Sequence, residues 1–225
     1  MATTVTINPI GKFWYQASSK FWEDLRNAVS SDGVSNTNPG RVGIAFDSPN
    51  YIFLRIYLKF DLSVIPEDAS IQSIRISLKR VDSLRSIYSP IIAYAGDKLN
   101  GNLSEYNSYL ANINGDGESL ATIDIDDNTQ YYKSSEFNDK GYTILPGDSL
   151  VVGIIDSLDF NNNIDEYSDT YLIDISNRED QPFLTVIYTG GGGGGYPNNV
   201  IGVSSANISS VRGVLSANIS KINVI

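Results

Sequence analysis

The sequence predicts an all-β body, a two-sheet sandwich with one short N-terminal helix, over residues 1–189. Three observations predict it. Apolar residues alternate with polar ones in several short segments, which is the spacing of a half-buried β-strand. Stretches rich in Asn, Asp, Gly and Ser separate these segments and are typical of turns. Only one segment, near residue 22, has the spacing of a helix.

The clearest strand is YIFLRIYLKFDL, residues 51–62. Apolar side chains occupy every second position from Ile52 to Leu62, and the positions between them include Arg55, Tyr57 and Lys59. This alternation predicts a strand that buries one face only. The segment IQSIRISLKR, residues 71–80, repeats the pattern, and a turn built on Pro66 is expected between the two strands.

The remaining elements follow from shorter patterns. A helix is expected in SKFWEDLRNA, residues 19–28, where Phe21, Trp22 and Leu25 share a face and Ser19 can act as N-cap. Trp22 is assigned to the core. Further strands are expected at Thr3–Ile7, Ile91–Ala95, Leu120–Ile125, Ser149–Ile155, Thr170–Ile175 and Phe183–Tyr188.

Composition argues against catalysis. The chain contains no cysteine and no histidine, so thiolate nucleophiles, imidazole bases, disulfides and the usual zinc ligands are excluded. The glycine run Gly190–Gly195 precedes Tyr-Pro, which cannot open a phosphate-binding helix. Paired carboxylates such as Asp124 with Asp126 leave glycoside hydrolysis as the one enzymatic alternative. We expect a non-enzymatic protein.

Charge and hydropathy restrict the partners. The net charge is −10, and residues 96–189 carry 4 basic and 18 acidic side chains. Such a surface repels nucleic acid and anionic membranes. The N-terminal residues lack the basic and apolar regions of an export signal, and the longest apolar run, residues 150–155, is too short to cross a bilayer. We expect neither nucleic-acid binding nor membrane insertion.

The acidic half also contains a candidate metal site. The segment DSLDFNNNIDEYSD, residues 156–169, concentrates the hard oxygen ligands that calcium prefers, although the Gly and terminal Glu of an EF-hand loop are absent. A solvated acidic surface is the alternative. The residues predicted to hold a structural calcium are Asp156, Asp159, Asn161 and Asp165.

The last 36 residues predict a tether and a docking tail. A glycine linker, residues 190–195, has a root-mean-square span of about 13 Å. In the tail, residues 196–225, GVSSANIS at 202–209 recurs as GVLSANIS at 213–220. Val, Ile, Ser, Asn and Gly favour an extended β-type tail over a helix, and the odd period of eleven requires a turn or bulge at each Gly-Val. Too few apolar residues are present for the tail to fold alone, so we expect it to order against a partner. The residues expected to face that partner are Ile201, Val203, Ile208, Val211, Val214 and Ile219.

Several of these segments carry a family resemblance. The stretch GRVGIAFDSPNYIFLRIYLKFDLSVIPEDASIQSIRISLKR, with the closing QPFLTVIYT, resembles jelly-roll modules of the DNRLRE type, which are related to carbohydrate-binding modules and occur in bacterial surface proteins and phage virions. Residues 85–150 are not matched. The tail is similar to glycine-tethered, ANIS-containing ends of tailed-phage structural proteins. The residues that carry the body resemblance are Arg55, Phe60, Asp61, Ile65, Pro66 and Pro182–Tyr188.

The resemblance implies a jelly-roll β-sandwich in a bacteriophage virion, as a capsid-associated, neck or fibre subunit made in the host cytoplasm. Its implied partners are other virion proteins, copies of itself and a host surface glycan. A secreted or cell-surface bacterial carbohydrate-binding module is the alternative, and it needs an export signal. The resemblance also allows a structural calcium. Exposed aromatic rings would contact a glycan; the candidates are Trp14, Tyr15, Tyr131 and Tyr132.

Overall fold

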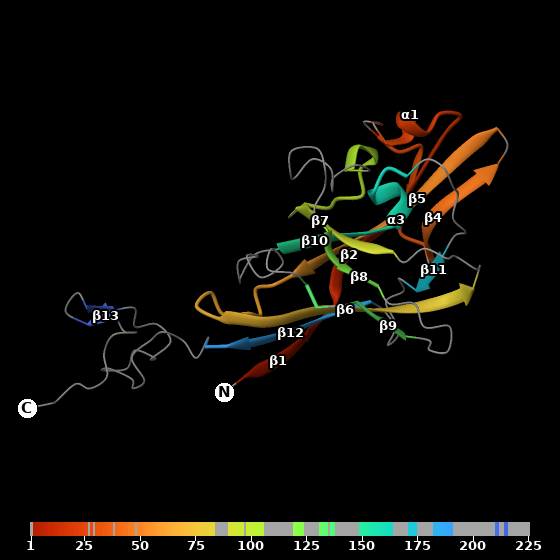
Figure 1. The fold of residues 1–225 in the computed structure, drawn as a ribbon. Coiled ribbons are helices and arrows are strands. Elements are labelled where there is room, and N and C mark those ends of the chain that lie inside the picture. Colours follow the sequence, from red (N-terminus) through yellow and green to blue (C-terminus); the bar gives the residue numbers. More distant parts are fainter. Residues whose placement is uncertain are drawn as a thin grey trace, which may run out of the picture.

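The computed structural model describes most of the body and two short segments of the tail. The described residues are 2–26, 28, 30–37, 39–47, 49–83, 90–96, 98–105, 119–123, 131–134, 136–137, 149–163, 171–174, 182–190, 210–211 and 214–215. Within them the chain consists mostly of antiparallel β-strands with two short α-helices, so the predicted all-β sandwich with an N-terminal helix is confirmed (Figure 1).

The first sheet is built around β6. β12 and β11 follow one another along one edge of β6, β9 pairs with its other edge, and β1 pairs with the far side of β12. All of these pairs are antiparallel. The strands of this sheet are β1 (Thr3–Ile7), β6 (Ser70–Ser83), β9 (Tyr131–Lys133), β11 (Tyr171–Asp174), β12 (Phe183–Thr189) and the first residues of β4 (Gly40–Asp47).

The second sheet is built around β5. β2 pairs with β5 along nearly its whole length, and β10 and the second part of β4 share the other edge. β3 extends the sheet beyond β2, and β7 and β8 extend it beyond β10. The strands of this sheet are β2 (Pro9–Ser19), β3 (Gly33–Ser35), β5 (Asn50–Asp61), β7 (Ile91–Gly96), β8 (Ser119–Thr122) and β10 (Ser149–Ile155).

The chain passes between the two sheets at two bends. It pairs with β12 up to Ile7 and with β5 from Pro9 onward. Similarly, β4 pairs with β11 up to Val42 and with β5 from Gly43 onward. Gly43 has a φ of 142°, a conformation that residues with a side chain rarely adopt. Glycine at this position therefore allows one strand to serve both sheets, as at the corners of other sandwiches.

The inner core lies between the sheets. Alternate residues of four strands fill it, and each is at most 1% exposed. The predicted apolar face of residues 71–80 is confirmed, because Ile74, Ile76 and Leu78 are buried; on the opposite face Arg75 is exposed, but Ser77 is buried as well. The other inner-core residues of these strands are Ile56, Leu58, Phe60, Leu150, Val152, Ile154, Leu184 and Val186.

The second sheet is buried on its outer face as well, which the sequence pattern did not predict. Phe53, Arg55 and Tyr57 of β5 have no exposed surface, so the expectation of a half-buried strand is wrong. The reason is a covering layer formed by α1 (Trp22–Arg26), α3 (Ser157–Phe160) and residues 98–105, which end in the 3-10 helix η1 (Leu103–Glu105). We call the apolar cluster under this layer the outer core.

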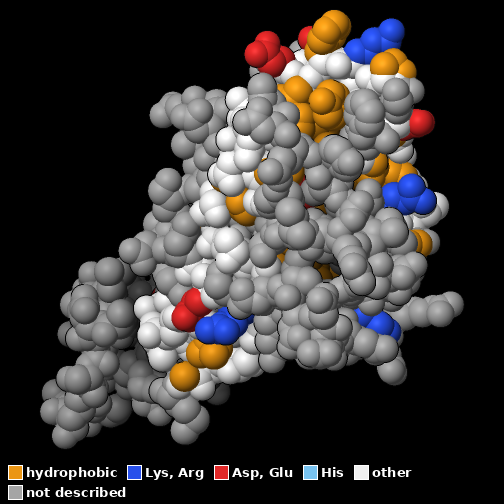
Figure 2. Space-filling model, turned by 45° about the vertical axis from the view of Figure 1, so that its right-hand side comes forward, with side chains coloured by type: hydrophobic (Ala, Val, Ile, Leu, Met, Phe, Trp, Pro, Cys, Tyr) orange, Lys and Arg blue, Asp and Glu red, His pale blue; other side chains and the backbone are white. Residues whose placement is uncertain are grey.

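Helix α1 occupies the predicted helical segment but is shorter. Trp22 and Leu25 are buried in the outer core, as expected for Trp22, and the Trp22 ring meets Phe53 edge-on with centroids 4.7 Å apart. The Ser19 hydroxyl accepts the Phe21 N–H at 3.2 Å. Phe21 itself is 67% exposed, so its assignment to the apolar face is wrong: it precedes the first helical residue. Figure 2 shows hydrophobic side chains on the surface at this end of the molecule.

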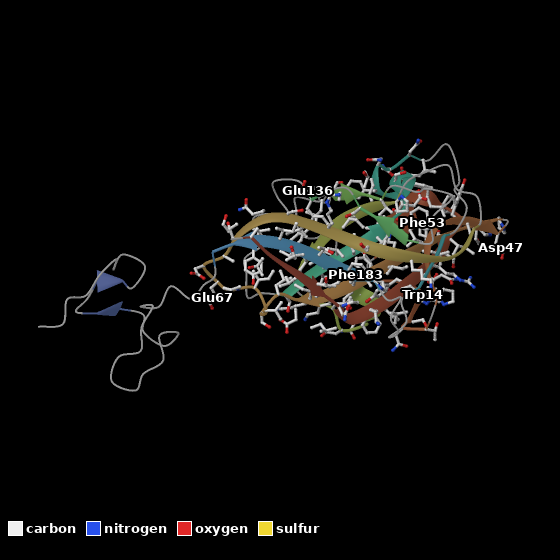
Figure 3. The ribbon with its side chains drawn as sticks, turned by 90° about the horizontal axis from the view of Figure 1, so that it is seen from below. Trp14, Asp47, Phe53, Glu67, Glu136 and Phe183 are labelled. Atoms are coloured by element: carbon white, nitrogen blue, oxygen red, sulfur yellow. The ribbon has the colours of Figure 1, made fainter. Side chains whose placement is uncertain are left out.

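The chain leaves the sandwich at a defined point. β12 ends at Thr189, and Gly190 follows with a φ of 79°. A Cβ on Gly190 would lie 3.3 Å from the Asp68 carbonyl oxygen, so the exit lies beside the turn between β5 and β6. Glu67 of this turn and Asp47 at the end of β4 lie at opposite ends of the sandwich (Figure 3). The exit therefore marks one end of the body.

Two tail segments are described. β13 (Ser210–Val211) and β14 (Val214–Leu215) form an antiparallel pair in which Val211 lies opposite Val214. The other tail residues lie outside the described part of the chain. No helix in the described ranges is long and apolar enough to span a bilayer.

Candidate functional site

A buried ion pair joins the central strand to α3. The Arg55 guanidinium donates from Nε to Asp159 Oδ2 at 2.6 Å and from Nη2 to Asp159 Oδ1 at 2.7 Å. Arg55 is 0% and Asp159 1% exposed. A bidentate, charge-assisted contact of this kind fixes orientation as well as distance. It therefore anchors α3 to the outer face of the second sheet.

The predicted calcium ligands have other roles where they are described. Asp156 is the N-cap of α3, and its Oδ1 accepts a backbone N–H of the helix at 2.8 Å. Asp159 uses both oxygens to bind Arg55. Asn161 is exposed at the end of α3, and Asp165 lies outside the described residues. Among the described side chains, no three of the usual metal-ligating types form a group that could hold an ion.

Tyr15 lies in the outer core and not at the surface. It is 0% exposed, its hydroxyl donates to Glu105 Oε2 at 2.9 Å, and its ring packs edge-on against Tyr57. Burial, and then the nearby Glu105 carboxylate, raise the pKa of Tyr15 far above its ordinary value. A ring without exposed surface cannot stack on a sugar, so the assignment of Tyr15 to glycan contact is wrong.

Glu105 also organises the loop that covers Tyr15. Its carboxylate accepts the backbone N–H groups of Asn100, Gly101 and Asn102 at 2.9–3.1 Å. Gly101 has a φ of 78°, and a Cβ there would fall 2.5 Å from the Phe13 ring. The loop therefore needs both the Glu105 acceptor and a glycine at position 101 to close over the outer core.

Trp14 borders a cleft on β2 and β3. Trp14 lies opposite Ser35 in the β2–β3 pair, and the Arg41 guanidinium carbon lies 5.9 Å from the Trp14 ring centroid. No atom lies within 4 Å of the place where a Gly33 Cβ would be, so this part of the cleft is open. The cleft has a volume of about 230 Å³. It is lined by Trp14, Gln16, Asp32, Gly33, Val34 and Ser35.

The cleft offers an aromatic ring beside polar groups, which is an arrangement suited to a small polar ligand. The Asp32 carboxylate accepts the Ser18 N–H at 2.6 Å and the Ser18 hydroxyl at 2.8 Å through the same oxygen, Oδ2. Trp14 Nε1 is buried and has no hydrogen-bond partner among the described groups. A ligand in the cleft could not reach this N–H, and because the half-buried Trp14 side chain also packs against the inner core, only the part of it that lines the cleft is available for contact.

The remaining predicted site residues are placed by backbone alone or lie outside the described chain. Tyr131 and Tyr132 belong to β9 and lie opposite Lys79 and Leu78 of β6. Val211 and Val214 pair in the tail. The four other tail residues predicted to face a partner lie outside the described residues: Ile201, Val203, Ile208 and Ile219.

Sequence reasoning missed two features of the site. Arg55 carries a signal, because a charged residue between Leu54 and Ile56 in a long apolar strand requires a partner if the strand is central. The Trp14 cleft is the second feature. Asp32 and Ser35 carry no sequence signal for it, because their proximity to Trp14 depends on the pairing of β3 with β2.

No protein-family model matches the chain, and no curated protein matches it.

Proposed function

We propose that the chain is a non-enzymatic structural protein of a bacteriophage virion. Its sandwich body is displayed on the particle, and its C-terminal tail anchors the body to other virion subunits. The observation that carries this proposal is the position of the tail. β12 is paired on both edges, with β1 and with β6, before the glycine run begins.

This arrangement supports an anchoring role because the described sheet needs no strand from residues 196–225. An apolar sequence repeated at a fixed period, joined to the body by a run of glycines, is then available for another surface. The exit at Gly190 lies at one end of the body, so the opposite end, with Asp47, would face away from the particle (Figure 3).

The test is the protein content of purified particles. We expect mass spectrometry to find the full-length chain as a stoichiometric component. A chain that ends at Thr189 should be produced and folded, with the same circular dichroism and melting temperature, but should be missing from the particles. Recovery of the full-length chain only outside the particles would contradict the proposal, and so would normal incorporation of the shortened chain.

A second candidate, favoured by the Trp14 cleft, is recognition of a carbohydrate. Aromatic rings bind the apolar faces of sugars, and Gln16, Asp32 and Ser35 supply polar groups beside Trp14. This role is compatible with display on a virion and equally with a bacterial carbohydrate-binding module.

The cleft can be tested without disturbing the core. Gly33→Leu places a side chain in open space, so it should abolish binding to host surface polysaccharide in a pull-down while leaving the melting temperature unchanged. Phe21→Ala removes an exposed aromatic ring outside the cleft and is the matched control. Equal binding by the Gly33→Leu variant and the unmodified protein would exclude the cleft as the site.

A further inference from the structure

The edge of β1 is the least protected strand edge in the described part of the sandwich. β1 pairs with β12 on one side, and no described strand pairs with its other side. It is five residues long, TTVTI, without charge, proline or glycine. The other terminal strands of the sheets are shorter: β3 and β9 have three residues each and β8 has four.

An edge of this kind is suited to receiving another strand. Its free backbone N–H and C=O groups form a template for pairing, and natural sandwiches usually protect such edges with charges, prolines or bulges. β1 has none of these between Thr3 and Ile7. Its side chains also present two distinct faces, because Ile7 is buried and Val5 half-buried while Thr4 and Thr6 are exposed.

The tail repeat has the matching alternation. In Ser-Ala-Asn-Ile-Ser, residues 205–209, Ala206 and Ile208 alternate with polar residues, and residues 216–220 repeat this order. A strand of this sequence beside β1 would place Ala206 and Ile208 on the face of Val5 and Ile7 and its polar residues on the threonine face. We propose that the free edge of β1 binds a tail repeat from a second copy of this chain, as an added antiparallel strand.

Strand direction favours a second copy over the chain's own tail. β1 is antiparallel to β12, with Thr3 opposite Tyr188, and the tail continues directly from β12. A tail of the same chain that folds back along β1 directly after Gly190 would run antiparallel to β12 and hence parallel to β1, and to pair in the antiparallel direction it would first have to cross the length of β1. All strand pairs described for this chain are antiparallel. A tail from another copy can approach in the antiparallel direction, which gives the more stable pairing.

This inference rests on the proposed anchoring role of the tail and names what the tail binds. Where several copies are displayed next to one another on a particle, a tail that engages β1 of its neighbour would link them. The tail would leave one body beside the β5–β6 turn and begin its pairing with the next body at Ile7, ending at Thr3, because an antiparallel strand starts opposite the last residue of β1.

The absence of cysteine from the chain allows a direct test by disulfide trapping. Two full-length, single-cysteine chains are mixed: one carries Thr4→Cys, and the other carries Ser205→Cys, Asn207→Cys or Ser209→Cys and a mass tag. Because each chain has one cysteine, a bridge between tagged and untagged chains reports contact between copies. Non-reducing gels are expected to show this mixed dimer, since disulfides form only when Cβ atoms approach closely.

Two controls make the result specific. Thr122→Cys, an exposed threonine on the edge strand β8, should trap the same tail cysteines several-fold less than Thr4→Cys. Ala206→Cys should also form several-fold less disulfide with Thr4→Cys, because the residue 206 side chain would point to the opposite face.

Equal trapping at Thr4 and Thr122 would overturn the proposal. A chain carrying both Thr4→Cys and Asn207→Cys that closes on itself in dilute solution, without forming dimers, would show that its own tail occupies the edge and would overturn it as well.

The outcome is separable from that of the particle experiment. Loss of the shortened chain from particles without trapping at β1 would leave the anchoring role intact and exclude the β1 edge. Trapping at β1 with normal incorporation of the shortened chain would support the contact between the tail and β1 and exclude the anchoring role.

Discussion

The Arg55 guanidinium and the Asp159 carboxylate face each other through two parallel hydrogen bonds, although 104 positions separate them in the sequence. Arg55 belongs to the central strand of the second sheet, and Asp159 belongs to α3. Both side chains are shielded from water, so the two charges interact in a buried environment. Removal of either partner takes away the bidentate contact of a buried charge, which is one of the most destabilising changes in a protein core.

We therefore expect Asp159→Asn to lower the free energy of unfolding by about 3–5 kcal/mol, measured by urea denaturation. Replacement of both residues by leucine should recover much of this loss, because no unpaired charge then remains. The matched control is Glu136→Gln, which changes a surface pair with Arg75 whose nitrogen–oxygen distance is 3.7 Å and should cost less than about 1 kcal/mol. Equal effects of Asp159→Asn and Glu136→Gln would contradict the structural importance of the buried pair.

Tyr15 is expected to make stability depend on alkaline pH. Its pKa is raised in the folded state, first by burial and then by Glu105, whereas in the unfolded chain it titrates at its ordinary value near 10. Above that pH the unfolded state releases the proton and the folded state retains it, so stability falls as pH rises. The loss should approach about 1.4 kcal/mol per pH unit from Tyr15 alone.

The comparison that isolates Tyr15 is Tyr15→Phe, followed by urea denaturation at several pH values. Below pH 9 the variant should be less stable by about 0.5–1.5 kcal/mol, because the hydrogen bond to Glu105 is lost. Above about pH 10 this difference should shrink, since the variant lacks the titrating group. A difference that stays constant across this range would show that Tyr15 does not titrate differently in the two states.

How far the sequence predicts this fold depends on what each strand packs against. The alternation in residues 71–80 identifies β6 and its buried face, because Ile74, Ile76 and Leu78 face the inner core while Arg75 on the other face is exposed, although Ser77 beside it is buried. The same alternation in residues 51–62 identifies β5 but assigns Arg55 and Tyr57 incorrectly, because the layer over them comes from distant segments. β2 was missed because its core positions mix Tyr15 and Ala17 with lysine, glutamine and serine neighbours.

The candidate site was less predictable than the strands, because it too depends on contacts between segments that are distant in the sequence. Trp14 was identified by residue type, but its cleft exists only because β3 pairs with β2. Tyr15, the next residue, has the same residue-type signal and points into the outer core. Neighbouring residues of a strand face opposite sides, so composition alone could not separate the two.

Gly101 provides a test of the loop that closes over the outer core. Gly101→Ala should lower the free energy of unfolding by about 1–3 kcal/mol, because a positive φ and the approach of the Phe13 ring both oppose a Cβ. Gly33→Ala is the matched control, since no atom lies within 4 Å of its Cβ position, and it should be neutral or slightly stabilising. Denaturant unfolding of both variants checks this, and a Gly101→Ala variant as stable as the Gly33→Ala variant would contradict the described loop geometry.

Calcium is not expected to stabilise the body. Asp159 is bound to Arg55, and Asp156 caps α3, so two of the four predicted ligands already have partners. Addition of a chelator, or of excess calcium, should therefore leave the melting temperature unchanged. A rise with calcium would require a site that includes residues outside the described ranges, such as Asp165, because a ligand that binds only the folded state must stabilise it.

We expect incorporation into particles to fail when charge is added at the isoleucines of the tail repeats, but not when it is added at the neighbouring serines. Ile208 and Ile219 are equivalent residues of the two repeats, and burial of each against a partner would contribute roughly 1.5–3 kcal/mol. Ile208→Asp combined with Ile219→Asp removes this contribution and places charge in the contact, so incorporation into particles should fail while the melting temperature of the body stays unchanged. The matched control combines Ser209→Asp with Ser220→Asp, which adds the same charge at the neighbouring positions and should reduce incorporation much less. Quantitative mass spectrometry of purified particles compares the variants with the unmodified chain. If both double variants are incorporated equally, the isoleucines do not face a partner, and the apolar docking surface assigned to the tail is wrong.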